Sequence, residues 1–232
     1  MATASGLDRQ QGDPIKMQIL ATEHWSLLAT RSLTYSESLS RVTMFLSVLS
    51  GAVIALALVA QADRFGRTFV LIAILVLSVV LFVGIATVVR LGNINRDDMR
   101  WVIGMNRIRH AYLELRPELE PYFVAGQHDD ARGVFLTLGF ETLPSGSPKD
   151  ALHGIQTLPG MIAVIVAVVA GALGALVANS LSAPAAVDVV AAVAAFVLTI
   201  AAFGYWGQRA ILKFTRNFAP RFPGATESQS TA

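Results

Sequence analysis

Two long apolar runs, residues 42–60 and 69–89, most constrain what this chain can fold into. Each has roughly the 20 residues that an α-helix needs to cross a bilayer, and neither contains a charged side chain. A short polar turn joins them, so together they predict a transmembrane hairpin. Residues 159–178 and 186–206 predict a second hairpin. The expected fold class is therefore all-α: a polytopic membrane protein with four transmembrane helices and a small cytoplasmic helical layer.

The composition agrees with the membrane class and excludes several others. Of the 232 residues, 54% are hydrophobic and only 15% are charged, whereas soluble domains carry about 25% charged residues. The formal net charge of +2 predicts no nucleic-acid partner. The chain has no cysteine, which excludes disulfides, thiolate metal sites and thiol catalysis.

The positions of lysine and arginine predict the orientation of the spans. If all four runs cross the membrane, 16 of the 18 basic residues lie on one side, and Arg64 and Arg67 lie on the other. Basic residues gather on the cytoplasmic side of membrane proteins. We therefore expect both termini, and the segment between the hairpins, in the cytoplasm.

Shifts in composition divide the chain into six segments. In order, they are a disordered lead (1–12), a cytoplasmic helix that continues into the first span (13–41), the first hairpin (42–90), a cytoplasmic helical segment with a linker (91–157), the second hairpin (158–207) and a cytoplasmic basic tail (208–232).

Local signals refine these segments. Asp13 and Pro14 are typical of a helix start, because a proline at the first helical position sacrifices no hydrogen bond. Gly92 predicts a kink or a new cap after the second span. The Gln-His-Asp-Asp sequence predicts the cap of a short helix over 131–138, and the Pro-, Ser- and Gly-rich stretch 142–149 predicts a flexible linker.

Two stripes of apolar residues repeat at alternating spacings of three and four, which is the pattern of a packed helical seam. The first stripe contains Trp25, Leu28, Tyr35 and Leu39, and Ser32 completes its spacing. The second contains Trp101, Met105, Ile108, Tyr112 and Leu115. We expect the second stripe to pack on the first, or on the copy of the first in another subunit.

Small residues mark the expected helix contacts inside the membrane, because they let two backbones approach closely. In the third span they recur every four residues, at Ala163, Ala167, Gly171 and Ala175. Ser47 and Gly51 form a similar pair in the first span. Self-association into a homo-oligomer is the expectation.

No motif predicts catalysis, a bound metal or a cofactor. The consecutive residues 128–130 (His-Asp-Asp) would point in three directions on a helix, so we interpret them as capping residues. His24 and His110 are interpreted as polar edge positions, with a metal pair across their two helices as the alternative. Residues 145–147 (Ser-Gly-Ser) lack the flanks of a nucleophile elbow.

Six arginines are the strongest candidates for a binding face on the cytoplasmic side. Anionic phospholipid headgroups of the bilayer, or a protein partner, are the expected ligands, and near a membrane surface each cation contributes about 1 kcal/mol. The alternative is that these side chains only solvate a helix face. They are Arg90, Arg96, Arg100, Arg107, Arg109 and Arg116.

The interiors of the four spans contain no Asp, Glu, Lys, Arg or His, which disfavours an ion-coupled transporter. Hydroxyl side chains in the first span leave a pore open as an alternative, because rings of such groups can line a channel. These are Thr43, Ser47 and Ser50.

The sequence also resembles known proteins over most of residues 15–205. The stretches 23–31 (EHWSLLATR), 101–114 (WVIGMNRIRHAYLE) and 117–123 (PELEPYF) are similar to an uncharacterised group of four-span bacterial integral membrane proteins. The layout of a cytoplasmic helix, a hairpin and a further helix is loosely similar to the SLATT-type effectors, which implies oligomers that breach a membrane. The second hairpin departs from that layout.

The function expected from these features is that of a non-enzymatic, self-associating scaffold or regulatory subunit. The resemblance implies a bacterial inner (plasma) membrane protein, and the apolar runs and basic residues predict several passes with cytoplasmic termini. An oligomeric ion channel or membrane-permeabilising effector is the alternative, and a membrane enzyme is the third possibility.

Overall fold

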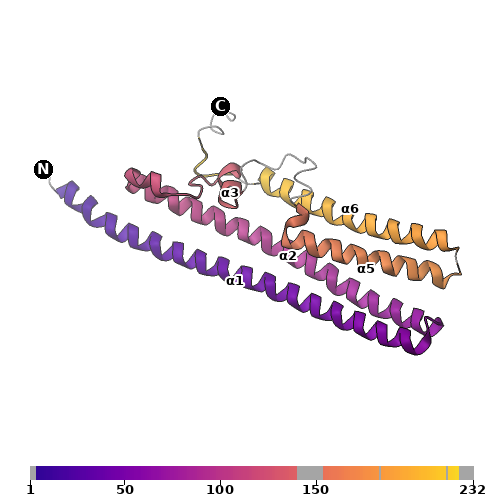
Figure 1. The fold of residues 1–232 in the computed structure, drawn as a ribbon. Helices are drawn as coiled ribbons and strands as arrows, with labels where there is room; N and C mark the ends of the chain where they lie inside the picture. Colours follow the sequence, from indigo (N-terminus) through magenta and orange to yellow (C-terminus); the bar gives the residue numbers. More distant parts are fainter. Residues whose placement is uncertain (1–3, 140–153, 183, 218, 225–232) are drawn as a thin grey trace. The chain divides into compact units, whose positions relative to one another are not determined.

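The computed structural model describes residues 4–139, 154–182, 184–217 and 219–224, and their ordered elements are all helices (Figure 1). In chain order they are α1 (Ala4–Asp63), α2 (Arg67–Leu115), the 3-10 helix η1 (Pro117–Tyr122), α3 (Ala131–Thr137), α5 (Leu158–Ser180) and α6 (Ala185–Asn217). Over these ranges no strand is present. The predicted linker 142–149 and residues 225–232 of the predicted tail lie outside the described residues.

The predicted all-α class with four spans is confirmed. Four helical stretches are long and apolar enough to cross a membrane, and they lie within Pro14–Asp63, Arg67–Leu115, Leu158–Ser180 and Ala185–Phe214. The chain forms two compact units. The first contains Met1–Ser36, Asn95–Ser145 and Thr215–Ala232, and the second contains Glu37–Ile94 and Gly146–Phe214.

Two predicted interruptions of helices are wrong. The first helix begins at Ala4 and includes Pro14 in its interior, so the residues expected to be a disordered lead are largely helical. Their sequence, which includes leucine, arginine and two glutamines before Gly12, favours the helix by propensity.

The predicted break at Gly92 is also absent, because α2 continues without interruption from Arg67 to Leu115. The structure gives another reason for the glycine. A Cβ atom at Gly92 would lie 2.5 Å from Cζ3 of Trp206. Gly92 therefore accommodates the indole ring of Trp206 on α6, and no new helix cap forms there.

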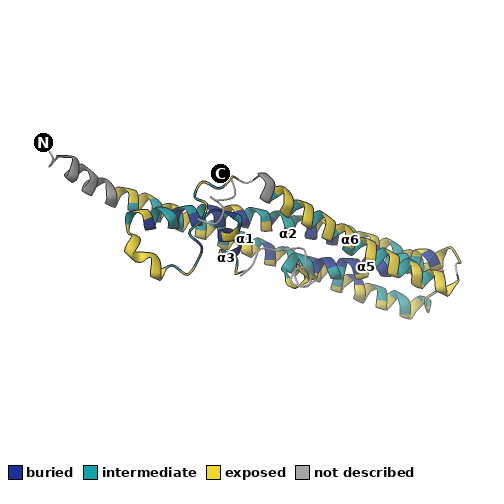
Figure 2. Ribbon diagram, turned by 90° about the horizontal axis from the view of Figure 1, so that it is seen from above, coloured by how far each residue is buried: buried dark blue, intermediate teal, exposed yellow. Residues whose placement is uncertain are grey.

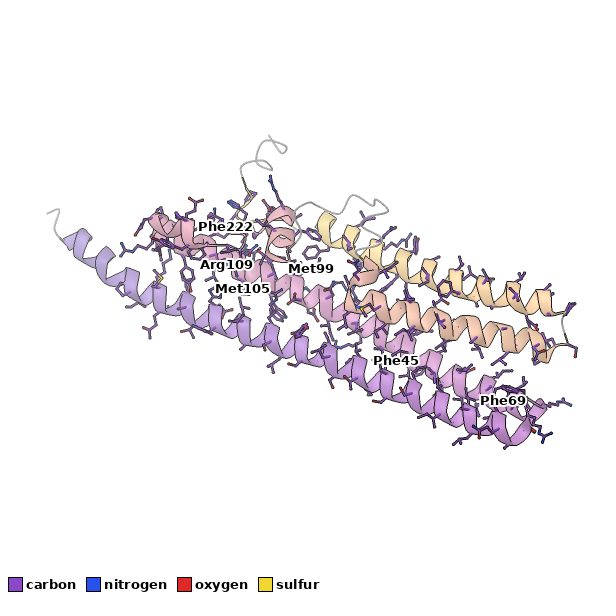
Figure 3. All side chains as sticks on the ribbon, in the orientation of Figure 1. Phe45, Phe69, Met99, Met105, Arg109 and Phe222 are labelled. Carbon is purple, nitrogen blue, oxygen red and sulfur yellow. The ribbon has the colours of Figure 1, made fainter. Side chains whose placement is uncertain are left out.

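The core of the second unit lies where α1, α2 and α5 meet. Phe45 from α1, Val80 from α2 and Val166 from α5 are almost completely buried. Gly84 of α2 provides the space for this contact, since a Cβ there would lie 2.6 Å from Cγ2 of Val166. Figure 3 labels Phe45 on α1 within this region.

The small residues of α5 lie in close contacts within the second unit. Ala163, Ala167 and Gly171 are buried, and Ala175 is half-buried. A Cβ at Gly171 would lie 3.0 Å from the carbonyl oxygen of Ala192, so α5 and α6 approach backbone to backbone. Buried residues gather on α2 and α5, whereas none of the α6 side chains described is buried (Figure 2).

In the first unit α2 lies between α1 and α3 (Figure 1). The face of α1 that meets α2 carries His24, Leu27 and Arg31. The His24 ring stacks on Tyr112 with centroids 5.9 Å apart, and the side chain of Leu27 lies against Gly104.

The predicted intramolecular seam on α1 is wrong for this chain. Trp25 and Tyr35 are 72% and 65% exposed, and Leu28 and Leu39 are exposed as well. On α2, Met105 and Ile108 are buried, and Trp101, Tyr112 and Leu115 are half-buried. The neighbouring stripe of α1 faces α2 instead, and it places Arg31 opposite Asp98.

Candidate functional site

The start of α3 is the most elaborate polar arrangement in the first unit. Asp130 caps this helix, as the sequence predicted, because its Oδ1 accepts the Gly133 N–H at 2.6 Å. A Cβ at Gly133 would lie 2.2 Å from the carbonyl oxygen of His128. Only glycine fits there, so the loop before α3 is held tightly against the first turn of the helix.

The neighbouring residue Asp129 has a different role from capping. Its side chain is fully buried and accepts three hydrogen bonds. The donors are Nε of Arg107 at 2.7 Å, the backbone N–H of Arg221 at 3.0 Å and the backbone N–H of Phe222 at 2.8 Å. One carboxylate thus joins α2 to a segment near the end of the chain.

These three donors also decide the ionisation of Asp129. Burial by itself raises the pKa of a carboxyl group, but the two backbone N–H groups and the Arg107 guanidinium favour the charged form. Their combined effect holds the pKa of Asp129 below its usual value. Asp129 is therefore a carboxylate at neutral pH and acts only as an acceptor.

Residues 219–224, which we call the C-terminal strap, lie over this site. Besides the two bonds to Asp129, the Gly224 N–H donates to Oδ2 of Asp130 at 2.8 Å. The carbonyl oxygen of Phe222 lies 3.3 Å from Nδ1 of His128. The centroid of the Phe222 ring lies 4.5 Å from that of the His110 ring. Figure 3 labels Phe222 in the same region as the α2 residues Arg109 and Met105.

The loop that carries both aspartates is fixed from below by Asn106, which is fully buried in α2. Its Nδ2 donates to the carbonyl oxygen of His128 at 2.8 Å. Its Oδ1 accepts from Nη1 of Arg109 at 2.8 Å and from Oγ1 of Thr137 at 3.0 Å. The amide nitrogen thus holds the loop, and the amide oxygen joins α2 to the last residue of α3.

Most of the six arginines predicted to form a binding face have partners inside the chain. Arg90 forms a two-pronged ion pair with Glu37 at 2.9 and 3.0 Å, and Arg107 and Arg109 hold Asp129 and Asn106. Arg96 is half-buried. Arg100 and Arg116 are exposed, and Arg100 pairs loosely with Asp97 at 3.3 Å.

The interpretation of the histidines changes as well. His24 lies against Tyr112, whereas His110 lies against His128 and Phe222, so the structure does not bring His24 and His110 together. Among the residues that the structure describes, no three His, Asp or Glu side chains are grouped to hold a metal ion. Residues 145–147 lie outside the described residues.

The role of Asp129 was missed by reasoning from the sequence. Two consecutive aspartates before a helix predict capping, and one of them does cap. The backbone donor at Arg221 lies 92 residues further along the chain. Because any residue except proline carries a backbone N–H, a single sequence has no signal that pairs these two positions.

The four apolar helices define a multi-pass α-helical membrane protein. No protein-family model, no curated protein and no solved structure matches the chain.

Proposed function

We propose that the chain is a non-enzymatic, self-associating integral membrane protein that acts as a scaffold or regulatory subunit. Within this proposal it resides in the bacterial inner membrane, and both termini are cytoplasmic. The observation that supports it most directly is an unused small-residue pair on α1, in a helix apolar enough to cross a membrane.

This pair is formed by Ser47 and Gly51, which are both exposed. No atom lies within 4 Å of a Cβ atom built at Gly51, whereas a Cβ at Gly171 would meet the backbone of α6 at 3.0 Å. The small residues of α5 are thus already packed inside the chain, and those of α1 remain open. In lipid, where apolar burial gives no drive to associate, such a pair favours contact with another helix.

The hydroxyl groups on the same side of α1 bear on the channel alternative. Ser47 donates to the carbonyl oxygen of Thr43 at 2.9 Å, so its hydroxyl is satisfied within its own helix and needs no water. This favours a helix contact over a water-filled lumen. The channel remains the second proposal because Thr43, Ser47 and Ser50 are all exposed on α1.

Anionic phospholipid headgroups are the other partner that we propose. The support is limited to the arginines that remain accessible. Arg100 and Arg116 are exposed, while Arg90 and Arg107 are held by carboxylates of the same chain. A contribution of about 1 kcal/mol for each accessible arginine is expected near an anionic surface.

Subunit counting in liposomes tests self-association. We expect the wild-type chain to form oligomers. Gly51→Leu should lower the number of subunits per assembly, because the leucine side chain occupies the space through which a second helix would approach. Gly204→Leu is the matched control, since Gly204 also has no atom within 4 Å of a Cβ, and it should leave the count unchanged. Single-molecule photobleaching of labelled protein provides the count.

Two results would contradict the proposal. A wild-type monomer at all protein-to-lipid ratios would exclude self-association. Ion flux in the same liposomes that is abolished by Ser47→Leu, and not by Gly204→Leu, would replace the scaffold with the channel.

Thiol labelling tests the proposed orientation, and the absence of cysteine from the chain makes single-cysteine variants clean. Phe65 and Leu181, at the ends of the two hairpins, are 72% and 77% exposed, and Val124 is 98% exposed. In intact cells, Phe65→Cys and Leu181→Cys should react with an impermeant maleimide, and Val124→Cys should react only after lysis. The opposite pattern would invert the topology.

A further inference from the structure

We infer that the surface formed by His110, His128, Asp129 and Asp130 is a recognition site for a bent peptide segment, and that the C-terminal strap is its detachable intramolecular ligand. This inference concerns the first unit alone and does not depend on self-association in the membrane. Four observations carry it: the donors involved, the rigidity of the surface, the shallow burial of the strap and the fit of Gly224.

The strap is recognised mainly through its backbone. Three of its N–H groups, from Arg221, Phe222 and Gly224, donate to carboxylate oxygens at 2.8 to 3.0 Å. Hydrogen bonds to a charged acceptor are roughly twice as strong as neutral ones. The Phe222 ring adds a side-chain contact with His110. Such a site selects a segment that bends where Arg221 and Phe222 lie, so that two consecutive N–H groups reach one carboxylate, and that carries a correctly placed aromatic residue.

Pro220 and Pro223 suit the strap to this mode of binding. A proline cannot donate a backbone hydrogen bond. The site needs none from these two residues, because the three donors are their neighbours in the chain. Each proline also restricts the free segment, which reduces the conformational entropy lost on docking. The two prolines therefore stand at positions from which the carboxylates accept no hydrogen bond.

The surface is held in place by contacts that do not involve the strap. The Gly133 N–H fixes Asp130, and Arg107 fixes Asp129. The Asn106 side chain holds the loop that carries both aspartates against α2. None of these contacts involves an atom of the strap. The site is thus preformed, as expected of a binding surface rather than of a packed core.

The strap itself is only lightly packed. Both aspartates are buried, but none of the residues from Ala219 to Gly224 is buried, and Arg221 and Pro223 are exposed. Few apolar contacts resist release of such a segment, so it can open without unfolding the helices beneath it. Because the strap is covalently attached to the unit that binds it, its effective concentration at the site is high, and it rebinds readily after it opens.

Gly224 gives the site a specific requirement. A Cβ at this position would lie 3.2 Å from Oδ2 of Asp130 and 3.4 Å from Cδ2 of His128. A side chain at this position would press on the carboxylate that accepts the Gly224 N–H. The preferred ligand therefore contains Phe-Pro-Gly, with its glycine against Asp130.

Amide hydrogen exchange of the full chain in detergent, with mass spectrometry at single-residue resolution, tests this inference. If the strap opens alone, the N–H groups of Arg221, Phe222 and Gly224 should exchange at least about tenfold faster than that of Gly133. A synthetic peptide with the sequence of residues 219–224, blocked at both ends, should accelerate strap exchange further in proportion to its concentration. The protection of α3 should not change.

Two controls make the result specific. A peptide of the same composition in scrambled order should have no effect on the strap. Gly224→Ala should raise strap exchange in the absence of peptide while leaving the Gly133 amide protected.

Three outcomes would overturn the inference. Equal exchange of the strap and Gly133 would show that the strap is an integral part of the fold. Exchange of α3 that rises together with that of the strap would show the same. A strap that opens alone but is not displaced by the native peptide at any concentration would show that no recognition site exists.

Discussion

Replacing Asp129 with alanine is expected to lower the free energy of unfolding of the first unit by about 2 kcal/mol, because it removes a fully buried acceptor from one charged donor and two backbone donors. Arg107 and the N–H groups of Arg221 and Phe222 lose the acceptor they share. Chemical denaturation in mild detergent, followed by limited proteolysis of the first unit, provides the measurement.

Asp97→Ala is the matched control for this change. It also removes an aspartate paired with an arginine of α2, but the Asp97–Arg100 pair is longer, at 3.3 Å, and the Arg100 side chain is 72% exposed. Exposed pairs contribute at most about 1 kcal/mol. Equal losses for Asp97→Ala and Asp129→Ala would show that the buried carboxylate has no special role.

The pH dependence of stability separates the contribution of the Asp129 charge from that of the size and shape of its side chain. The folded pKa of Asp129 is lowered, so its stabilising contribution is fully present above the unfolded pKa of about 3.9. It is lost as the pH falls through the lower, folded value. The stability difference between wild type and Asp129→Asn should therefore be constant near neutral pH and shrink below about pH 4. A difference that is independent of pH would contradict this account.

Gly84→Leu is expected to have the largest effect in the second unit. A Cβ atom at this position would already lie 2.6 Å from Cγ2 of Val166 and 3.0 Å from Cε2 of Phe45. Phe45 and Val166 are both fully buried, so neither can move aside without displacing α1 or α5. Overpacking of this kind costs about 1 to 3 kcal/mol or more.

The melting temperature of the detergent-solubilised protein provides the measurement for Gly84→Leu. Gly204→Leu is the matched control, because no atom lies within 4 Å of a Cβ there and both glycines are in apolar helices. We expect a clear decrease for Gly84→Leu and almost no change for Gly204→Leu. A fully folded Gly84→Leu with an unchanged melting temperature would contradict the close contact of α1, α2 and α5.

The spans were predictable from the sequence because the bilayer imposes a length of apolar helix that few other structures need. The short helix α3 was predictable because Asp130 is a local signal, three residues from the N–H that it accepts. Gly92 was misread, since glycine both interrupts helices and admits close neighbours, and only the position of Trp206 distinguishes the two uses.

The register of α1 in the first unit was misread for another reason. A spacing of three and four fits more than one stripe of the same helix, and the apolar stripe through Trp25 was the more obvious one. The structure uses the stripe that contains Arg31, whose Nε and Nη2 donate to the two carboxylate oxygens of Asp98 at 2.7 and 3.1 Å. The face of α1 that meets α2 thus combines this ion pair with the contacts of His24 and Leu27.

The contact of Trp206 with Gly92 also restricts how the second unit can move. The indole ring occupies a notch that exists because Gly92 has no side chain. To slide along α2, α6 would have to lift its ring out of this notch. The contact therefore fixes the position of Trp206 along α2.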